Sequence, residues 1–375
     1  MRFLILNTDY PEFLRWLYTQ DSALATRSYE EQLRARYNSL FGVADFYSSN
    51  LRKLGHEAWD IDFNNEALQR AWAKEHGVVL PPQRRSLKFY LRGGKVPWIN
   101  YRPDPSWMHT VLDAQLRHYT PEVVVNQSPV AIPRHLLDGI KPRPRLLVAQ
   151  IASPFPKGAD FSRYDLIVSS LPNFVEQFHH AGLKAELHRL AFEPGILGKL
   201  ATGGRSIPAS FVGTVSRSHR TRVQLLEHLC RRTNLMVWGW GERTLAAKSP
   251  IRSRYRGYAW GREMYQVLSD SKLTVNHHID VAGHYANNLR LFEATGVGTL
   301  LITDWKQNIG DLFEPGKEVA TYRSPAECAE LIEYYLAHED ERKAIARAGQ
   351  ERTLREHTYS QRMQELNTLV QRYLK

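Results

Sequence analysis

The sequence has little cysteine and no long apolar run. Its 375 residues include only two cysteines, Cys230 and Cys328, and each lies in an apolar helical pattern. This predicts neither a disulfide framework nor a cysteine metal site, and it fits a reducing cytoplasm. No stretch approaches the roughly 20 apolar residues that span a bilayer, and the run 3–6 is too short for a signal peptide. We expect a cytoplasmic protein, with at most a peripheral contact at the inner face of the membrane.

A glycine fingerprint for dinucleotides is also missing. The first expected strand is followed by Asn-Thr-Asp-Tyr-Pro at 7–11, which disfavours a nicotinamide- or flavin-dependent enzyme. Gly239 and Gly241 follow a later strand, but no third glycine completes the pattern. We therefore expect no cofactor.

Metal ligands are equally sparse. Asp60 and Asp62 point the same way on an expected strand and could hold a divalent ion. We interpret them instead as a polar face at a strand end, with Trp59, Ile61 and Phe63 facing the core. No metal site is predicted.

Positive charge is in excess. The formal net charge is +11, from 50 Lys and Arg against 39 Asp and Glu. Such an excess indicates an anionic partner, which could be nucleic acid, an acidic membrane surface or a phosphorylated small molecule. Charge alone does not choose among these partners.

Short apolar runs alternate with helical patterns, which is typical of βαβ units on parallel sheets. The expected strands are 3–6, 58–63, 123–125, 146–149, 166–168, 186–190, 210–212, 235–238, 273–275 and 299–302. The expected helices are 41–54, 108–118, 174–181, 223–230, 262–268, 289–295, one after the capping box at 324–327, and 360–374. The pattern predicts an α/β protein with two Rossmann-like domains, 1–194 and 195–359, facing a cleft that holds the ligand.

The segment that begins at Asn287 is the most informative part of the chain. The helix expected there places Asn287, Arg290 and Glu293 along one face, with Asn288 beside them. A helix N-terminus with Asn and Arg suits a diphosphate, because free N–H groups and the macrodipole favour anions there. A carboxylate one turn later could accept hydrogen bonds from both hydroxyls of a ribose. The same residues also fit an ordinary surface helix.

A second candidate phosphate site follows the expected strand 210–212. The strand runs into a turn at Gly213 and then into a basic cluster made up of Arg217, His219, Arg220 and Arg222. A strand end that leads into a helix presents backbone donors as well as charge, so Gly213 and Arg217 suit a phosphate group at the cleft. A solvated basic face is the alternative interpretation.

The C-terminal third carries several motifs of one known family, in that family's order. They comprise Asn276, His277, Arg290, Phe292, Glu293, Ala294, Gly296, Leu301 to Asp304, Phe313 to Gly316, Glu318, Ala348, Gly349, His357 to Tyr359 and Arg362. On these residues the chain resembles the CgeB-like group of glycosyltransferases, group 1 enzymes with the two-domain GT-B fold. The resemblance covers roughly the last hundred residues strongly and the N-terminal half only in general pattern.

This resemblance implies a hexosyltransferase-like enzyme that moves a sugar from a nucleotide diphosphate donor to an unidentified glycan, lipid or protein acceptor. The acceptor is implied to face the N-terminal domain, and segment 360–375 is implied to cross back to it. The implied donor site in the C-terminal domain comprises Gly213, Arg217, Asn276, His277, Asn288, Arg290 and Glu293. Glu293 falls where related enzymes hold the ribose, whereas Tyr285 replaces a second acid found eight positions earlier in some of them.

The expected mechanism depends on stabilising the leaving group. Arg290, Asn288 and Arg217 would offset the charge that grows on the departing diphosphate, so no metal is required. An inverting reaction would also need a base for the acceptor hydroxyl. Asp9, at the end of the first strand and facing the cleft, is the candidate, although Asp9 could instead form a turn before Pro11.

Two other functions fit the sequence. The interleaved Tyr255, Arg256, Tyr258 and Trp260, with the charge of +11, fit a nucleic-acid-binding protein, whose binding would weaken strongly with salt. An inactive sensor of nucleotide sugars would bind the donor without hydrolysing it.

Overall fold

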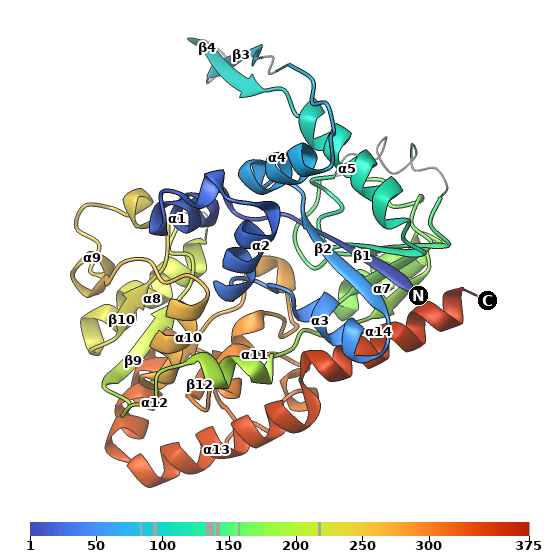
Figure 1. The fold of residues 1–375 in the computed structure, drawn as a ribbon. Helices are drawn as coiled ribbons and strands as arrows, with labels where there is room; N and C mark the ends of the chain where they lie inside the picture. The colour runs from blue at the N-terminus through green and yellow to red at the C-terminus, as the bar shows by residue number, and fades with distance from the viewer. Residues whose placement is uncertain are drawn as a thin grey trace.

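The computed structural model describes residues 1–82, 85–92, 96–132, 139, 143–156, 158–216 and 219–374, and of 85–103 only the backbone. Within these residues it contains two parallel sheets, of six and five strands, and a separate two-stranded hairpin. Figure 1 shows the two sheets in separate halves of the molecule, each surrounded by helices. The predicted α/β fold with two Rossmann-like halves is confirmed, whereas the boundary at residue 194 stays a prediction.

The N-terminal sheet has the strand order β2-β1-β5-β6-β7-β8. Its strands are β1 (Arg2–Asn7), β2 (Glu57–Asp62), β5 (Val123–Asn126), β6 (Leu146–Gln150), β7 (Leu166–Ser169) and β8 (Ala185–Leu187). Alternate residues of β1 enter different cores, with Phe3 and Ile5 on one face and Leu4 and Leu6 on the other. The strands therefore read as continuous apolar runs, because helices cover both faces of the sheet.

The helices of this half are α1 (Pro11–Gln20), α2 (Tyr29–Asn38), α3 (Phe46–Lys53), α4 (Glu66–Glu75), α5 (Ser106–Tyr119) and α7 (Pro172–His180), with 3-10 turns at Leu24–Thr26 and Pro194–Lys199. The antiparallel hairpin comprises β3 (Arg85–Arg92) and β4 (Val96–Pro103). Helix α3 starts later than the predicted 41–54, because Leu40, Gly42 and Ala44 all have positive φ, which a helix excludes. Residues 41–43 form a loop instead.

The C-terminal sheet has the strand order β10-β9-β11-β12-β13. Its strands are β9 (Ile207–Val212), β10 (Met236–Trp238), β11 (Ser271–Asn276), β12 (Leu300–Asp304) and β13 (Ala320–Tyr322). Its helices are α8 (Arg220–Arg232), α9 (Ile251–Arg254), α10 (Arg262–Ser269), α11 (Leu289–Gly296), α12 (Pro325–Ala337) and α13 (Glu339–Glu356), with 3-10 turns at Glu242–Thr244, Asp280–Ala282 and Ile309–Asp311. No described helix is long and apolar enough to cross a membrane.

The last helix, α14 (Tyr359–Tyr373), packs against α3 of the N-terminal half (Figure 1). Thr358 and Gln361 form a reciprocal capping box at its start. The backbone N–H of Phe192 donates to the carbonyl of His357, and Phe192 in turn accepts from Tyr359. These bonds join the segment that leaves the N-terminal half to the segment that returns to it.

Candidate active site

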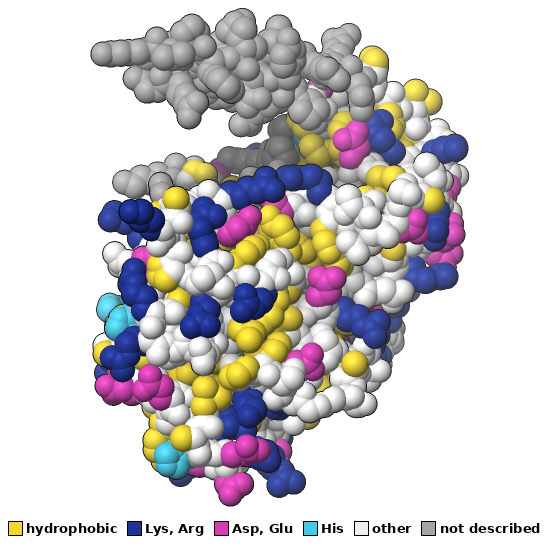
Figure 2. Space-filling view, turned by 90° about the vertical axis from the view of Figure 1, so that its left-hand side faces the viewer, with side chains coloured by type: hydrophobic (Ala, Val, Ile, Leu, Met, Phe, Trp, Pro, Cys, Tyr) yellow, Lys and Arg dark blue, Asp and Glu magenta, His cyan; other side chains and the backbone are white. Residues whose placement is uncertain are grey.

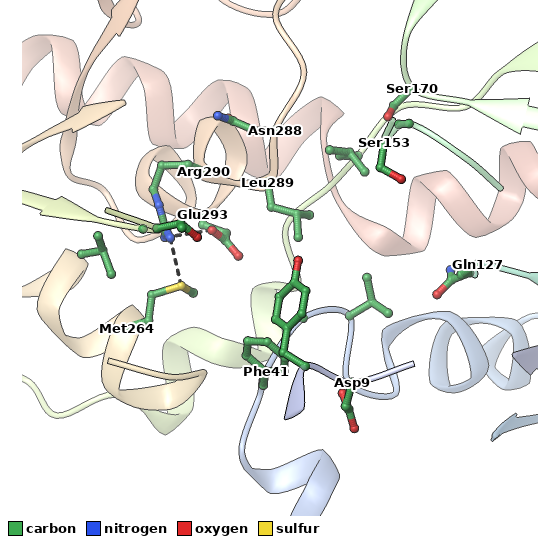
Figure 3. A pocket seen from close by; sticks show the side chains of 18 of the residues that line it. Asp9, Phe41, Gln127, Ser153, Ser170, Met264, Asn288, Leu289, Arg290 and Glu293 are labelled. Carbon is green, nitrogen blue, oxygen red and sulfur yellow. Dashed lines mark hydrogen bonds and ion pairs between the residues drawn. The ribbon is translucent and has the colours of Figure 1, made fainter. Parts of the chain in front are cut away.

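A cavity of about 570 Å³ lies where the carboxyl ends of both sheets meet. Its lining includes strand-end residues of each sheet, namely Asn7, Gln127, Gln150, Ser170, Gly213 and Asn276. We call its side formed by residues 7–190 the N-terminal wall and its side formed by residues 211–293 the C-terminal wall. Figure 3 shows Arg290 and Glu293 across the cavity from Gln127, Ser153 and Ser170. Open α/β sheets bind ligands at this kind of position.

Helix α11 places Arg290 and Glu293 on the C-terminal wall. Nη1 of Arg290 lies 2.8 Å from Oε2 of Glu293, and the hydroxyl of Tyr265 donates to Oε1 at 3.3 Å. Burial raises the pKa of Glu293, against the lowering effects of Arg290 and Tyr265. Each carboxylate oxygen therefore has one partner and can accept a second hydrogen bond.

The guanidinium of Arg290 is incompletely satisfied by the protein. Its Nη2 contacts the sulfur of Met264 at 3.1 Å (Figure 3), a weak acceptor. Its Nε and Nη1 are buried and have no hydrogen-bond partner among the described residues, since the contact with Glu293 is close but not aligned as a hydrogen bond. Buried donors without a partner are rare, and an absent ligand is one explanation of them.

Arg222 of α8 is a second buried arginine on the same wall. It donates to the carbonyls of Thr214 at 3.3 Å and His277 at 2.9 Å, whereas its Nε has no partner among the described residues. Burial lowers its pKa, Asp304 acts in the opposite direction, and the charge of Arg290 lowers the pKa further. The two guanidinium groups thus repel each other, and an anion between them would relieve this repulsion.

Arg222 belongs to the basic cluster that follows β9. The sequence pattern favours Arg217, and not Arg222, as the phosphate-binding residue of this cluster. Arg217 lies outside the described residues. Gly213 lines the cavity as expected, but its N–H donates to the carbonyl of Trp238 at 3.0 Å. Gly213 therefore places backbone at the cavity without offering its own N–H to it.

Asn276 and Asn288 both line the cavity and are hydrogen-bonded to each other. The amide of Asn288 donates to Oδ1 of Asn276 at 2.8 Å, and Asn276 donates to the Thr303 hydroxyl at 2.9 Å. Oδ1 of Asn288 caps α11 by accepting from the N–H of Leu291 at 3.3 Å. This pair fixes the start of α11. Its role is therefore to position Arg290, which lies in the first turn of that helix.

His277 follows β11 and lines the cavity. Its Nδ1 lies 3.0 Å from the hydroxyl of Tyr322, and burial lowers its pKa, although Asp304 opposes this. The neutral ring is favoured, so His277 adds hydrogen-bonding capacity to the wall rather than charge.

Asp9 is placed differently from what its predicted role requires. Its two carboxylate oxygens accept from Nε and Nη2 of Arg36 at 2.8 and 2.7 Å, and both side chains are almost fully buried. Figure 3 shows the Asp9 carboxylate turned away from Arg290 and Glu293. A carboxylate held by both oxygens would have to leave Arg36 to take a proton, so this contact favours a structural role. Its role as a base stays a prediction.

Asp60 and Asp62 lie on β2, and both are 2% exposed. The polar face predicted at this strand end is therefore buried, and Ile61 and Phe63 enter the core with Trp59 packed against it. Burial raises the pKa of each carboxyl to about 7. The described residues contain no group of three or more acidic, histidine or cysteine side chains placed to hold a metal ion.

In the aromatic and basic segment 255–260, two of the three aromatic side chains contact other parts of the fold. The Tyr255 hydroxyl donates to the carbonyl of Gly239, and Trp260 packs edge-on against Phe41 with ring centroids 5.1 Å apart. Figure 2 shows Lys and Arg side chains spread over one face, interrupted by hydrophobic, neutral and acidic ones. Nucleic acid is expected to need a continuous basic track with free aromatic rings, so this segment does not favour such a partner.

Comparisons with known proteins agree with this geometry. A family model described as glycosyl transferase-like matches residues 217–368. The crystal structure of HepE (Alr3699) from Anabaena with UDP-glucose aligns with a TM-score of 0.62 and 10% identity over 99% of both chains. AviGT4, a glycosyltransferase involved in avilamycin A biosynthesis, aligns with a TM-score of 0.58 and 14% identity, covering 100% of this chain and 98% of its own.

The sucrose-phosphate synthase of Thermosynechococcus elongatus aligns with a TM-score of 0.59 and 10% identity, covering 99% of this chain and 98% of its own. A sequence search of curated proteins finds no match. The finer resemblance to the CgeB-like group stays a prediction. Residues 217–368 therefore match a glycosyl transferase-like family, and the whole chain has the fold of the GT-B glycosyltransferases.

Proposed function

We propose that the protein transfers a hexose from a nucleoside diphosphate donor to an acceptor hydroxyl. The bond between the anomeric carbon and the diphosphate oxygen breaks, and its electron pair leaves with the nucleoside diphosphate. A new bond joins the anomeric carbon to the acceptor oxygen. The hydroxyl proton passes to the departing diphosphate if the configuration is retained, or to a protein base if it is inverted.

One observation carries this proposal: Arg222 and Arg290 line the same cavity wall and carry buried donors that have no hydrogen-bond partner in the part of the chain that the structure describes. Each guanidinium group belongs to the first turn of its own helix, Arg222 of α8 and Arg290 of α11. Such a pair suits a diphosphate and can stabilise the charge that develops as the diphosphate departs. Structural neighbours were crystallised with UDP and glucose or with UDP and GlcNAc, which supports a UDP-hexose as the first donor to test. Location in the cytoplasm and contact with a membrane remain proposals.

Calorimetric titration with nucleoside diphosphates tests donor binding, and release of the nucleoside diphosphate from a nucleotide sugar tests turnover. Saturable binding with turnover supports the transferase. Saturable binding without donor hydrolysis or transfer would instead support the inactive sensor. Binding to nucleic acid that falls steeply with salt, with no binding of nucleoside diphosphates, would overturn the proposal.

Glu293→Gln is expected to weaken binding of a ribonucleoside diphosphate by about 1.5–3 kcal/mol, the range for hydrogen bonds to a charged group. The reason is that the carboxylate can accept from both ribose hydroxyls while it keeps Arg290 and Tyr265 as partners. Calorimetry with the ribo- and 2′-deoxyribonucleotides measures the effect, and the loss should be smaller for the deoxy ligand.

The matched control for this prediction is Glu263→Gln, since Glu263 is exposed on α10 and should not affect binding. Melting temperatures of both variants show whether the loss of the Arg290 ion pair harms the fold. Equal losses for the ribo and deoxy ligands would remove Glu293 from the ribose site.

A chelator is expected to leave turnover unchanged within about twofold, because Arg222 and Arg290 can stabilise the diphosphate as a metal ion would. The measurement is nucleoside diphosphate release before and after dialysis against EDTA. Complete loss of turnover that Mg²⁺ or Mn²⁺ restores would contradict this expectation.

A further inference from the structure

The two walls of the cavity differ in charge. Arg222, Arg290 and Glu293 give the C-terminal wall a net positive charge. The described part of the N-terminal wall contains only Asp9 and Arg36 as charged residues, and these form a buried ion pair with side chains 2% and 3% exposed. The described residues of the N-terminal wall therefore present no free charge to a ligand.

Neutral hydrogen-bonding groups take the place of charge on this wall. Gln127 donates to Oε1 of Gln150 at 3.0 Å, and each amide keeps further capacity. The hydroxyl of Ser128 lies 2.8 Å from that of Thr8. Ser170 is 8% exposed, lines the cavity and makes no side-chain hydrogen bond within the described part of the chain.

An exposed aromatic ring completes the wall. Tyr10 lines the cavity and is 57% exposed, which is unusual for a large aromatic side chain within a site. Its ring meets Phe41 edge-on, with centroids 5.9 Å apart at 63°. Because more than half of the side chain is exposed beside this contact, apolar ring surface remains for a ligand.

We infer that the acceptor is a neutral carbohydrate, whose sugar ring lies on Tyr10 and whose hydroxyls bond to Gln127, Gln150 and Ser170. The C–H face of a sugar ring is apolar and its rim is polar, so it requires an aromatic surface beside neutral donors and acceptors. A phosphorylated or carboxylated acceptor would require a free cation on this wall. The inference rests on the proposed function and names the acceptor class.

The transfer step is the one already described: an acceptor hydroxyl oxygen gains the anomeric carbon, and the nucleoside diphosphate leaves with the electron pair. Neutral amides and hydroxyls contribute by orienting the attacking hydroxyl toward the C-terminal wall. Such orientation increases the reaction rate even when the N-terminal wall transfers no proton.

The test measures nucleoside diphosphate release from a UDP-hexose with no acceptor, then with neutral mono- and disaccharides, a sugar phosphate, a uronic acid and a serine peptide. Neutral saccharides alone are expected to raise release above the hydrolysis background, with new glycosides visible by mass spectrometry. Stimulation by the sugar phosphate, the uronic acid or the peptide, and not by neutral saccharides, would overturn the inference.

Tyr10→Ala is expected to raise the KM for the saccharide about tenfold, the equivalent of roughly 1.4 kcal/mol of lost contact, whereas Tyr10→Phe should keep KM within about twofold because the ring remains. Tyr258→Ala is the matched control, since Tyr258 is 46% exposed but stacks on Trp260 outside the cavity. An unchanged KM in Tyr10→Ala would refute the stacking contact.

Calorimetry with UDP separates this inference from the proposed function. An enzyme that binds UDP but transfers sugar only to charged or peptide acceptors would refute the acceptor class alone. An enzyme that binds no nucleoside diphosphate would refute the proposed function itself.

Discussion

Arg290→Ala is expected to lower kcat by about 10²–10³, the usual cost of removing one donor from a preorganised charge-stabilising site. Arg290 lines the C-terminal wall, and two of its buried nitrogens find no hydrogen-bond partner among the residues that the structure describes. Negative charge on the diphosphate grows as the sugar leaves, so this contact is strongest in the transition state. Nucleoside diphosphate release gives kcat, and calorimetry with UDP separates the loss in turnover from the weaker loss in binding.

Two comparisons make the Arg290 result specific. Arg290→Lys keeps the charge but loses the forked donors, so an intermediate loss is expected. Arg243→Ala removes an arginine whose side chain is 90% exposed and lies outside the cavity, and it should leave kcat unchanged. Arg290→Ala leaves the buried carboxylate of Glu293 without its ion-pair partner, which could destabilise the fold. The double variant Arg290→Ala with Glu293→Gln removes this buried charge and shows whether the loss of turnover comes from instability. Full turnover in a folded Arg290→Ala protein would contradict the proposed donor site.

The central strands were predictable because they are buried on both faces, whereas the edge strand β13 and the hairpin β3–β4 were not predicted. Runs such as 3–6 and 123–125 are continuous and apolar, and the sheet places helices on either side of them. Helix α2 was missed for the opposite reason. It buries Gln32 and Arg36, so it has no apolar stripe for a periodicity argument to find. Helix α13 buries Arg342, Gly349 and Thr353 as well as Ile345 and Ala346, so its apolar stripe is short.

The site was partly predictable from local spacing. Arg290 and Glu293 stand three residues apart on one helix, and their side chains meet at 2.8 Å. Asp9 and Arg36 are 27 residues apart, and Arg36 lies on the helix that the sequence did not reveal. Without that partner, a lone aspartate at a strand end is easily interpreted as a catalytic base. Contacts between distant segments are the information that a local pattern lacks.

Arg36→Met is expected to lower the free energy of unfolding by about 3–5 kcal/mol at pH 8, the range for breaking a buried ion pair by removing one partner. Asp9 would lose both of its bonds to Arg36, and Asp62 would lose a charge 3.8 Å away. Asp9 and Asp62 would then remain buried without the cation that now faces them, and Asp60 adds a further buried carboxyl beside Asp62.

The loss should be smaller at pH 5 than at pH 8. In the native protein burial raises the pKa of Asp60 and Asp62 to about 7, above an unfolded value of roughly 3.9. Their contribution to stability is therefore full below about pH 4 and is lost as the pH rises through 7. Since Arg36 lowers the pKa of Asp62, removing Arg36 raises that pKa further, and the variant loses more stability relative to the native protein above pH 7 than below it.

Urea unfolding at both pH values measures the difference. Arg34→Met is the control, because Arg34 is 65% exposed on the same helix, and it is expected to change stability by less than about 0.5 kcal/mol. An equal loss at pH 5 and pH 8 would show that Arg36 stabilises the fold by packing rather than by its charge.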